Sequence, residues 1–207
     1  MLRSEVRKTS INLNEVYTTI QGEGLLLGTP SIFIRVQGCN LRCPWCDQPS
    51  ALSFKDSPVG IDDLLRIVET YPHTHVVITG GEPFTEEALP ELVKELIKRK
   101  KSVQIETNGT LWQDALEDTA HRLHITCSPK AVAGWEVHPK IREYARELKF
   151  VVEEDLSLEV LFSFRDFLQK GCVVLQPEGN KKVFLESASS KPTSEPGPSG
   201  QGNSAGA

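Results

Sequence analysis

Apolar positions along the chain follow two different periods. Short runs rich in Val, Ile and Phe have the composition of β-strands bounded by turn-forming residues. We expect six strands, at residues 31–37, 75–79, 102–106, 123–127, 148–152 and 172–176. The extended segment 11–20 precedes the first strand and is a candidate for an additional strand or hairpin arm.

Between these runs, apolar residues recur with the spacing of amphipathic helices. The clearest example is the stripe formed by Leu89, Leu92, Val93, Leu96 and Ile97. The segments 61–68 and 158–168 show the same pattern, and 111–120 and 139–146 are weaker helix candidates. Strands that alternate with helices predict a parallel sheet with right-handed crossover connections.

Polar motifs follow nearly every predicted strand. They are QGCN after the first, TGGEP after the second, ETNGT after the third, SPK after the fourth and QPEG after the sixth. Active sites gather at the carboxyl ends of strands in both open sheets and barrels. Because almost all strands contribute, rather than one switch point, we expect a partial (β/α)6 TIM-like barrel around a shared cavity.

The composition divides the chain into two regions. Hydrophobic residues make up 39% of the sequence and charged residues 25%, as in globular domains. From position 187 onward the chain consists mainly of Ser, Gly, Pro and Ala, which cannot bury enough apolar surface to fold. We therefore predict one folded domain over residues 1–186 and a disordered low-complexity tail over 187–207.

Charge and hydropathy exclude several classes of partner. The 23 basic and 28 acidic side chains give a net charge of −5, which disfavours direct nucleic-acid binding. No apolar run approaches the length of a membrane span, and no signal peptide is recognisable. We expect a cytoplasmic protein without a membrane partner.

Three of the five cysteines fall within eight residues, at Cys39, Cys43 and Cys46. Clustered thiols in an intracellular chain are typical of metal sites rather than of disulfides. Three thiolates on a 4Fe–4S cube would leave one iron open to bind a substrate or cofactor. The alternative is a zinc site completed by a distant histidine such as His73 or His75.

The other two cysteines have a simpler explanation. Cys127 and Cys172 lie in apolar strand patterns, where a thiol behaves as a small hydrophobic side chain. None of the five histidines has a recognisable ligand spacing, so we place none of them in the site.

The cysteine motif is accompanied by a second motif in the order that a barrel requires. The pattern C-x3-C-x-aromatic-C after the first predicted strand, and GGEP at positions 80–83 after the second, resemble the radical S-adenosylmethionine (SAM) superfamily. The resemblance implies that the open iron chelates the methionine end of SAM, with glycines allowing close backbone approach.

Further motifs narrow the resemblance to one family. They are EVYTTIQGEG at 15–24, FIR at 33–35, QGC at 37–39, TGGEP at 79–83, ETNGT at 106–110, SPK at 128–130 and LQPEGN at 175–180. Together they resemble the 7-carboxy-7-deazaguanine synthases. The resemblance implies a lyase that converts 6-carboxy-5,6,7,8-tetrahydropterin into 7-carboxy-7-deazaguanine with loss of ammonia, in queuosine and 7-deazapurine biosynthesis.

The same resemblance implies cofactors, partners and site residues. The cofactors are a 4Fe–4S cluster, SAM and Mg2+, and the partners are an electron donor such as flavodoxin and a second copy of the chain. The cluster ligands are Cys39, Cys43 and Cys46. The SAM site comprises Trp45, Cys46, Asp47, Gly81, Glu82, Glu106, Ser128, Pro129, Lys130, Gln176, Pro177, Glu178 and Gly179. The substrate site comprises Ile20, Gln21, Gly22, Glu23, Arg35 and Thr79.

Specific roles follow for three of these residues. Gln21 and Glu23 can pair with the donor–acceptor edge of a pterin, as such side chains do with base edges. Arg35 can bind the substrate carboxylate with both arms of its guanidinium. We expect no protein side chain to be catalytic beyond the cluster and the radical derived from SAM. From the residues alone, Glu23 could be a solvated turn residue and Lys130 the cap of a loop.

The sequence departs from the family pattern in two places. Gln48 stands where the family has a serine or threonine that binds Mg2+, and its longer amide predicts weaker or altered metal activation. The family continues beyond QPEGN through a helix into a terminal strand with Arg, Gln and His, whereas here a helix-like start at 181–188 gives way to low-complexity sequence. We expect a more open substrate pocket.

Two other functions remain compatible with the cysteine motif. One is an activating enzyme for a glycyl-radical enzyme, which has no task for Gln21, Glu23 and Arg35. The other is an inactive cluster-binding paralogue.

Overall fold

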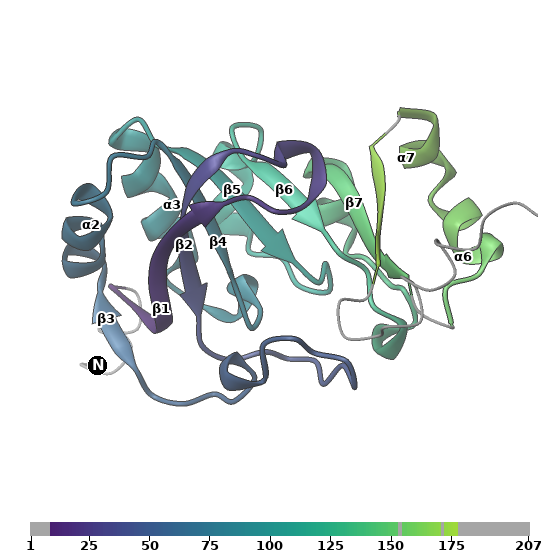
Figure 1. The fold of residues 1–207 in the computed structure, drawn as a ribbon, viewed down its shortest axis with the longest axis horizontal. Coiled ribbons are helices and arrows are strands. Elements are labelled where there is room, and N and C mark those ends of the chain that lie inside the picture. The colour runs from purple at the N-terminus through teal and green to yellow at the C-terminus, as the bar shows by residue number, and fades with distance from the viewer. Residues whose placement is uncertain (1–8, 153–154, 171, 178–207) are drawn as a thin grey trace, which may run out of the picture.

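The computed structural model of the chain describes residues 9–152, 155–170 and 172–177 (Figure 1). The predicted tail and the predicted site residues Glu178 and Gly179 lie outside these ranges. Within them, no helix is long and apolar enough to cross a membrane.

A single eight-stranded sheet forms the centre of the described structure. Its spatial order is β3-β1-β2-β4-β5-β6-β7-β8. The strands are β1 (Ser10–Ile20), β2 (Pro30–Val36), β3 (Pro58–Gly60), β4 (His75–Gly80), β5 (Ser102–Thr107), β6 (His124–Cys127), β7 (Ala145–Val152) and β8 (Val173–Pro177). The six strands from β2 to β8, β3 excepted, pair in parallel, as the alternation of strands and helices predicts.

The sheet does not close into a complete barrel. β3 and β8 are its two edges, so each pairs with one neighbour (Figure 1). The predicted partial barrel of six parallel strands is thus confirmed, and the extended segment before the first strand is the additional antiparallel strand β1. The short strand β3 was not predicted, because its three residues acquire strand geometry only by pairing with β1.

The amphipathic segments supply the helices that cover the sheet. These are α2 (Ile61–Glu69), α3 (Leu89–Lys98), α4 (Glu117–Ala120), α5 (Pro139–Tyr144), α6 (Leu158–Ser163) and α7 (Arg165–Lys170). In α2 and α3 the predicted stripes are buried, apart from Ile97, which is partly buried, and Pro90 of α3 is buried as well. They pack in one core with the fully buried Val76 and Ile78 of β4.

Three predicted helices are shorter than expected. The segment 158–168 is interrupted at Phe164, whose ring turns into the core and packs edge-on against Phe150, with 5.4 Å between the ring centroids. The segment 139–146 ends at Tyr144, because Ala145 already pairs with β6 at the start of β7. In 111–120 only the last four residues are α-helical, after a 3-10 turn over Asp114–Leu116.

The connection between β1 and β2 reaches across the molecule. Residues 21–29, here called the bridging loop, contain the 3-10 turn η1 (Gly24–Leu26). The loop passes in front of β6 in Figure 1, and the backbone N–H of Leu25 donates to Glu147 Oε2 on β7 at 2.7 Å. The first loop of the chain therefore spans the concave side of the sheet toward its opposite edge.

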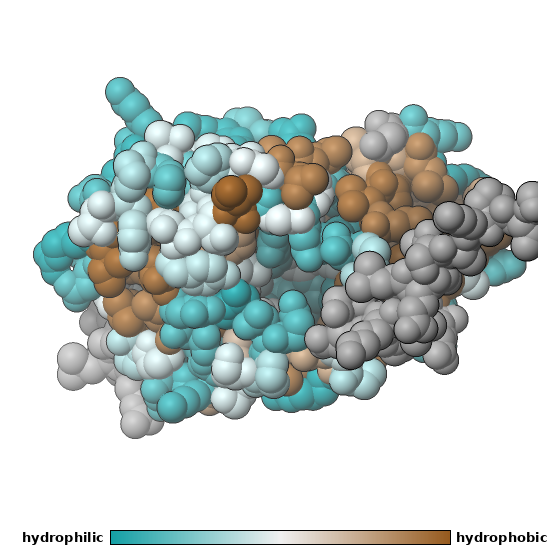
Figure 2. Space-filling model, viewed as in Figure 1, coloured by the Kyte–Doolittle hydropathy of each residue, from teal (hydrophilic) through white to brown (hydrophobic). Residues whose placement is uncertain are grey.

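The surface near that edge is apolar. Brown, hydrophobic atoms gather over the region of β8 and α7 in Figure 2, where the side chains of Leu168 and Leu175 are exposed. In the sequence, α7 is followed by residue 171 and β8 by residues 178–207, which are outside the described ranges.

Candidate active site

The carboxyl ends of the parallel strands surround a cavity of about 480 Å³. The predicted site residues that line it are Ile20, Gln21, Gly22, Glu23, Arg35, Cys39, Cys43, Trp45, Cys46, Asp47, Gln48, Thr79, Gly81, Glu106, Ser128, Lys130, Gln176 and Pro177. These residues come from the bridging loop, from residues 37–48 after β2, here called the cysteine loop, and from strands across the whole sheet. The structure thus gathers into one space residues that are up to 157 positions apart in the sequence, from Ile20 to Pro177.

Two predicted residues do not line the cavity. Pro129 is buried behind Ser128 and Lys130, and Glu82 is fully buried. The Glu82 carboxylate accepts hydrogen bonds from Thr107 Oγ1 and the backbone N–H of Asn108, both at 2.7 Å, and from the N–H of Phe84 at 3.1 Å. Burial raises the pKa of this carboxyl group. In this arrangement Glu82 ties the end of β4 to the end of β5, and its contact with SAM remains a prediction.

The three clustered cysteines all face the cavity. Cys39 is buried, Cys43 and Cys46 are half-buried, and none of the three is in a disulfide. Burial raises the pKa of Cys39, whose Sγ accepts a hydrogen bond from the N–H of Leu41 at 3.4 Å.

These thiols suit a cluster better than a single ion. Among the described residues no group of three or more His, Cys, Asp or Glu side chains converges tightly enough to hold one metal ion. Of the two histidines considered for a zinc site, His75 hydrogen-bonds Ser102 and Gln104 inside the sheet, and neither His73 nor His75 lines the cavity. A 4Fe–4S cube binds each thiolate to a different iron atom, so it does not require the sulfur atoms to meet at one point.

Backbone contacts join the cysteine loop to the glycine-rich loop after β4. The N–H of Glu82 donates to Gly38 O at 2.8 Å, and the N–H of Gly81 donates to Val36 O at 3.1 Å. A Cβ atom on Gly81 would lie 1.9 Å from Gly38 O, closer than any real contact. The glycine at position 81 is therefore required by this close approach, as the motif predicts.

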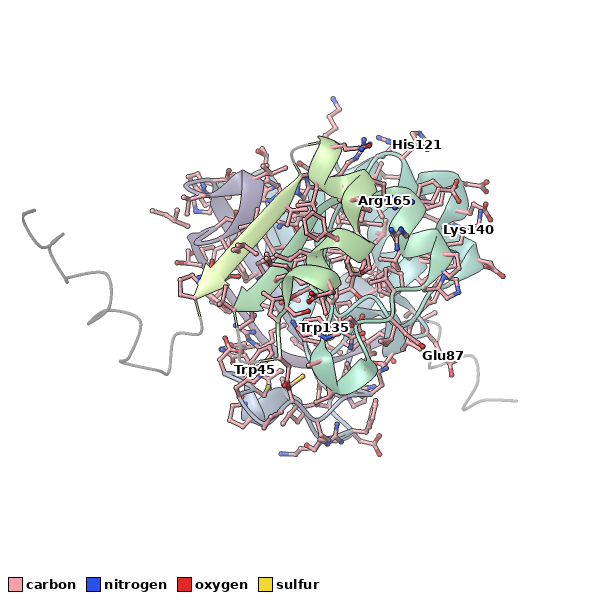
Figure 3. All side chains as sticks on the ribbon, turned by 90° about the vertical axis from the view of Figure 1, so that its right-hand side faces the viewer. Trp45, Glu87, His121, Trp135, Lys140 and Arg165 are labelled. Carbon is pink, nitrogen blue, oxygen red and sulfur yellow. The ribbon has the colours of Figure 1, made fainter. Side chains whose placement is uncertain are left out.

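Two predicted SAM-binding residues, Trp45 and Lys130, are in contact with each other. The ammonium group of Lys130 lies 5.1 Å from the ring centroid of Trp45 and donates to Ser128 Oγ at 2.5 Å. Figure 3 shows Trp45 on the cysteine loop, with the labelled Lys140 and Arg165 far from it.

The predicted substrate residues form a polar wall with internal hydrogen bonds. Gln21 is buried, and its amide group donates to both Gln104 Oε1 and Glu106 Oε1 at 3.0 Å. Thr79 Oγ1 donates to the second oxygen of Glu106 at 2.8 Å. Both amide hydrogens of Gln21 are thus used within the protein, so in this arrangement Gln21 orders Glu106 rather than presenting a donor to the cavity.

Arg35 also lies on this wall, near the base of the cavity. Its Nε donates to Glu15 Oε1 at 2.7 Å and its Nη2 to the Tyr17 hydroxyl at 2.6 Å. Burial raises the pKa of Tyr17, so this phenol stays neutral and accepts the guanidinium hydrogen bond. The predicted contact of Arg35 with a substrate carboxylate requires hydrogen-bond donors beyond these two.

Sequence reasoning missed one charged residue of the cavity. Lys149 on β7 lines the cavity and pairs with Glu23 of the bridging loop. The signal was present in the strand motif ELKFVV, where two charged residues alternate with the buried apolar residues Leu148 and Phe150. Such alternation places Glu147 and Lys149 on one face of the strand, a pattern that also fits a solvent-exposed face. In the structure this face points inward, where Lys149 lines the cavity and Glu147 is fully buried.

The remaining missed lining residues are less specific. They are Thr19, Phe33, Leu41, Leu52, Gly80, Thr107, Asn108 and Val151. They lie next to predicted motif residues or alternate with buried strand residues. No histidine lines the cavity among the described residues.

Comparisons with known proteins agree with this architecture. A sequence model of the radical SAM superfamily matches residues 33–147. A 7-carboxy-7-deazaguanine synthase of Aquifex aeolicus is 58% identical over 192 residues, which cover 91% of this chain and 88% of that protein. The synthase of Escherichia coli is 36% identical over 172 residues, covering 72% of this chain and 75% of that protein.

Solved structures are similar to this chain as well. The crystal structure of QueE from Escherichia coli is similar with a TM-score of 0.65 and 31% identity, covering 86% of this chain and 89% of that one. The structure of SuiB from Streptococcus suis, at 18% identity and a TM-score of 0.53, is similar in fold alone.

Proposed function

This chain belongs to the 7-carboxy-7-deazaguanine synthase family of the radical SAM superfamily, and we propose on that basis how its cavity performs the family's reaction. The chain is a radical SAM lyase that converts 6-carboxy-5,6,7,8-tetrahydropterin into 7-carboxy-7-deazaguanine with loss of ammonia, a step in queuosine biosynthesis. The observation that supports the substrate most directly is that one cavity holds both the three cysteines and the wall of Glu23, Arg35 and Glu106. An activating enzyme for a protein substrate would have no use for that wall.

The residues fit a 4Fe–4S cluster and SAM. Cys39, Cys43 and Cys46 would ligate the cluster, and Trp45 with Lys130 would flank SAM from two loops. When bound, these cofactors supply hydrogen-abstracting radical chemistry that protein side chains cannot provide.

The protein's own contribution is positioning and exclusion of water. The carboxylate of Glu23 is an acceptor for the N–H groups of a pterin, and Arg35 is the donor for its carboxylate. Glu106, predicted for the SAM site, lines the same cavity. Thr79 and Gln21 fix the orientation of Glu106 through one hydrogen bond each. Phe33, Leu41 and Leu52 make part of the cavity apolar, which limits the access of water to a reactive intermediate.

The further assignments belong to the same proposal. Mg2+ would bind beside the substrate carboxylate, where Gln48 lines the cavity with an amide oxygen that is a suitable but longer ligand. The protein would act in the cytoplasm as a homodimer, with a flavodoxin-like protein as electron donor. The SAM contacts predicted for Glu82, Pro129, Gln176 and Pro177 also belong here.

The test is a product assay under anaerobic conditions. The reconstituted full-length chain receives a reductant, SAM and 6-carboxytetrahydropterin, with and without Mg2+, and the products are identified by mass spectrometry. We expect 7-carboxy-7-deazaguanine from the wild type, weak stimulation by Mg2+, and no product from Cys43→Ala. Accumulation of 5′-deoxyadenosine without the deazaguanine would show that the substrate assignment is wrong.

A further inference from the structure

β7 directs two charged side chains toward the interior of the molecule. Glu147 and Lys149 are two positions apart and therefore lie on the same face of the strand. Leu148 between them is fully buried in the core on the other face. The Lys149 side chain is only 12% exposed, and an ammonium group this buried requires an anionic partner.

That partner comes from the other end of the chain. Lys149 Nζ donates to Glu23 Oε2 in the bridging loop, across 126 positions of sequence. Two further carboxylates face the ammonium group, Glu106 from β5 and Asp47 from the cysteine loop. Burial alone would lower the pKa of Lys149, but these three carboxylates outweigh it and raise the pKa, so the side chain stays charged.

The other cations that line the cavity are engaged elsewhere. Arg35 donates to Glu15 and Tyr17, and Lys130 donates to Ser128 while lying over Trp45. Among the cavity-lining cations that the structure describes, Lys149 alone forms a salt bridge with Glu23.

The bridging loop has a second attachment to the same strand. Glu147 accepts the N–H of Leu25 at 2.7 Å, two residues after Glu23. The backbone of the loop is thus held by Glu147 and its carboxylate by Lys149. Without these two contacts, a carboxylate on a loop would turn toward solvent. With them, Glu23 is held at the cavity wall.

We propose that Lys149 is a positioning residue for the pterin, because its salt bridge holds the Glu23 carboxylate at the cavity wall. A pterin presents two adjacent N–H donors on its amino-pyrimidinone edge, and a carboxylate accepts both only when it is ionised. Each carboxylate oxygen has two lone-pair sites, so Glu23 Oε2 can accept from Lys149 and from the pterin together. This inference rests on the proposed function, because it takes the pterin as the ligand.

The first test measures ligand binding without turnover. The probe is 6-carboxypterin, a fluorescent oxidised pterin with the same donor edge, titrated into the reconstituted full-length chain with SAM. Truncating one member of a buried charge pair should weaken binding by roughly 10- to 100-fold in Lys149→Met. Lys149→Arg keeps the charge and should restore most of the affinity. Urea unfolding of each variant identifies any that fail to fold.

The second test asks whether Lys149 acts through Glu23. In a double-mutant cycle, Glu23→Gln and the combined Glu23→Gln/Lys149→Met variant should bind the probe equally weakly, because the positioned group is already lost. Effects that multiply would overturn the proposal, since they would mean that Lys149 acts on the pterin or the fold independently of Glu23.

The third measurement separates this inference from the proposed function. We expect Lys149→Met to raise the KM for 6-carboxytetrahydropterin more than it lowers kcat. The matched control is Lys140→Met. Lys140 lies on α5, forms salt bridges with Glu117 of α4 and Glu143 of α5, and is far from Trp45 (Figure 3). If the wild type makes no deazaguanine, the proposed function fails. If it does and Lys149→Met matches Lys140→Met, only the role of Lys149 fails.

Discussion

At the scale of single residues, the interior of this protein contains charged groups whose hydrogen bonds are all provided by the protein. Glu147 is the clearest case. It is fully buried, and its Oε1 accepts from Thr126 Oγ1 at 2.7 Å and from His124 Nε2 at 3.0 Å. Since a carboxylate only accepts, Nε2 must be the protonated nitrogen of His124. Its Oε2 takes the backbone N–H of Leu25, so one side chain joins β6, β7 and the bridging loop.

Glu147→Gln should destabilise the fold. An amide has one acceptor oxygen, so its NH2 group must face either Leu25 N–H or the donors on β6. At least one buried donor is left without a partner, which should lower the free energy of unfolding by about 1–3 kcal/mol at pH 7. Urea unfolding measures the loss, and Glu117→Gln on the exposed surface of α4 is the control. Equal losses in the two variants would contradict the role of Glu147.

The same variant has a defined pH dependence. Burial alone would raise the pKa of Glu147, but hydrogen bonds from His124, Thr126 and Leu25 outweigh it and hold the pKa below its usual range. The contribution of such a group is present above its unfolded-state pKa of about 4.3 and is lost as the pH falls through the lower folded-state pKa. The difference between wild type and Glu147→Gln should therefore shrink below about pH 4.

At the scale of elements, the site depends on loops that are fastened to one another rather than on the strands alone. The motifs QGC and TGGEP were recognisable in the sequence because each ends a predicted strand. Their contact was not predictable, since it places Gly81 against the backbone of Gly38, and no periodicity encodes such an approach. The internal hydrogen bonds of Gln21 were missed for the same reason, because Gln104 is an unremarkable polar residue in its strand motif SVQIET.

Gly81→Ala should separate these two loops. The new methyl group would overlap Gly38 O and lie 2.7 Å from Ala51 O, and backbone atoms cannot rotate away as a side chain can. We expect a loss of about 1–3 kcal/mol or more in the free energy of unfolding, and lower iron content after reconstitution. The control is Gly60→Ala, where a Cβ would meet nothing closer than Asp63 Oδ2 at 3.5 Å. Full iron content in Gly81→Ala would contradict the importance of the contact.

At the scale of the whole molecule, the number and order of the parallel strands could be predicted, but the way the chain closes its cavity could not. Alternating strand and helix patterns give six parallel strands with right-handed crossovers. The bridging loop is irregular in sequence, so its path to β7 follows from two specific contacts, those of Glu23 and Leu25. Because long-range ion pairs leave no periodic pattern, Lys149 could be recognised only as a charge in an apolar strand.

Native-state hydrogen exchange should reveal the gradient in stability across this open sheet. β4 is flanked by β2 and β5, and its residues 75–79 are all buried. β8 is an edge strand, which among the described residues pairs with β7 alone. We expect peptides from residues 75–80 to exchange slowest and those from 173–177 among the fastest of the strands, because edge strands open without global unfolding. Equal protection of the two segments, measured by mass spectrometry, would contradict this gradient.

The path of the bridging loop also sets an order of events during protein synthesis. Glu23 leaves the ribosome long before Lys149, which is 126 positions further along the chain. At elongation rates of roughly 5–20 residues per second, that interval lasts about 6–25 s. For most of it, the three cysteines have been translated but β7 and β8 have not. A nascent chain therefore exposes its thiols to solvent. Either the cluster is inserted only after the last strands are translated, or a cluster inserted earlier has to be protected until then.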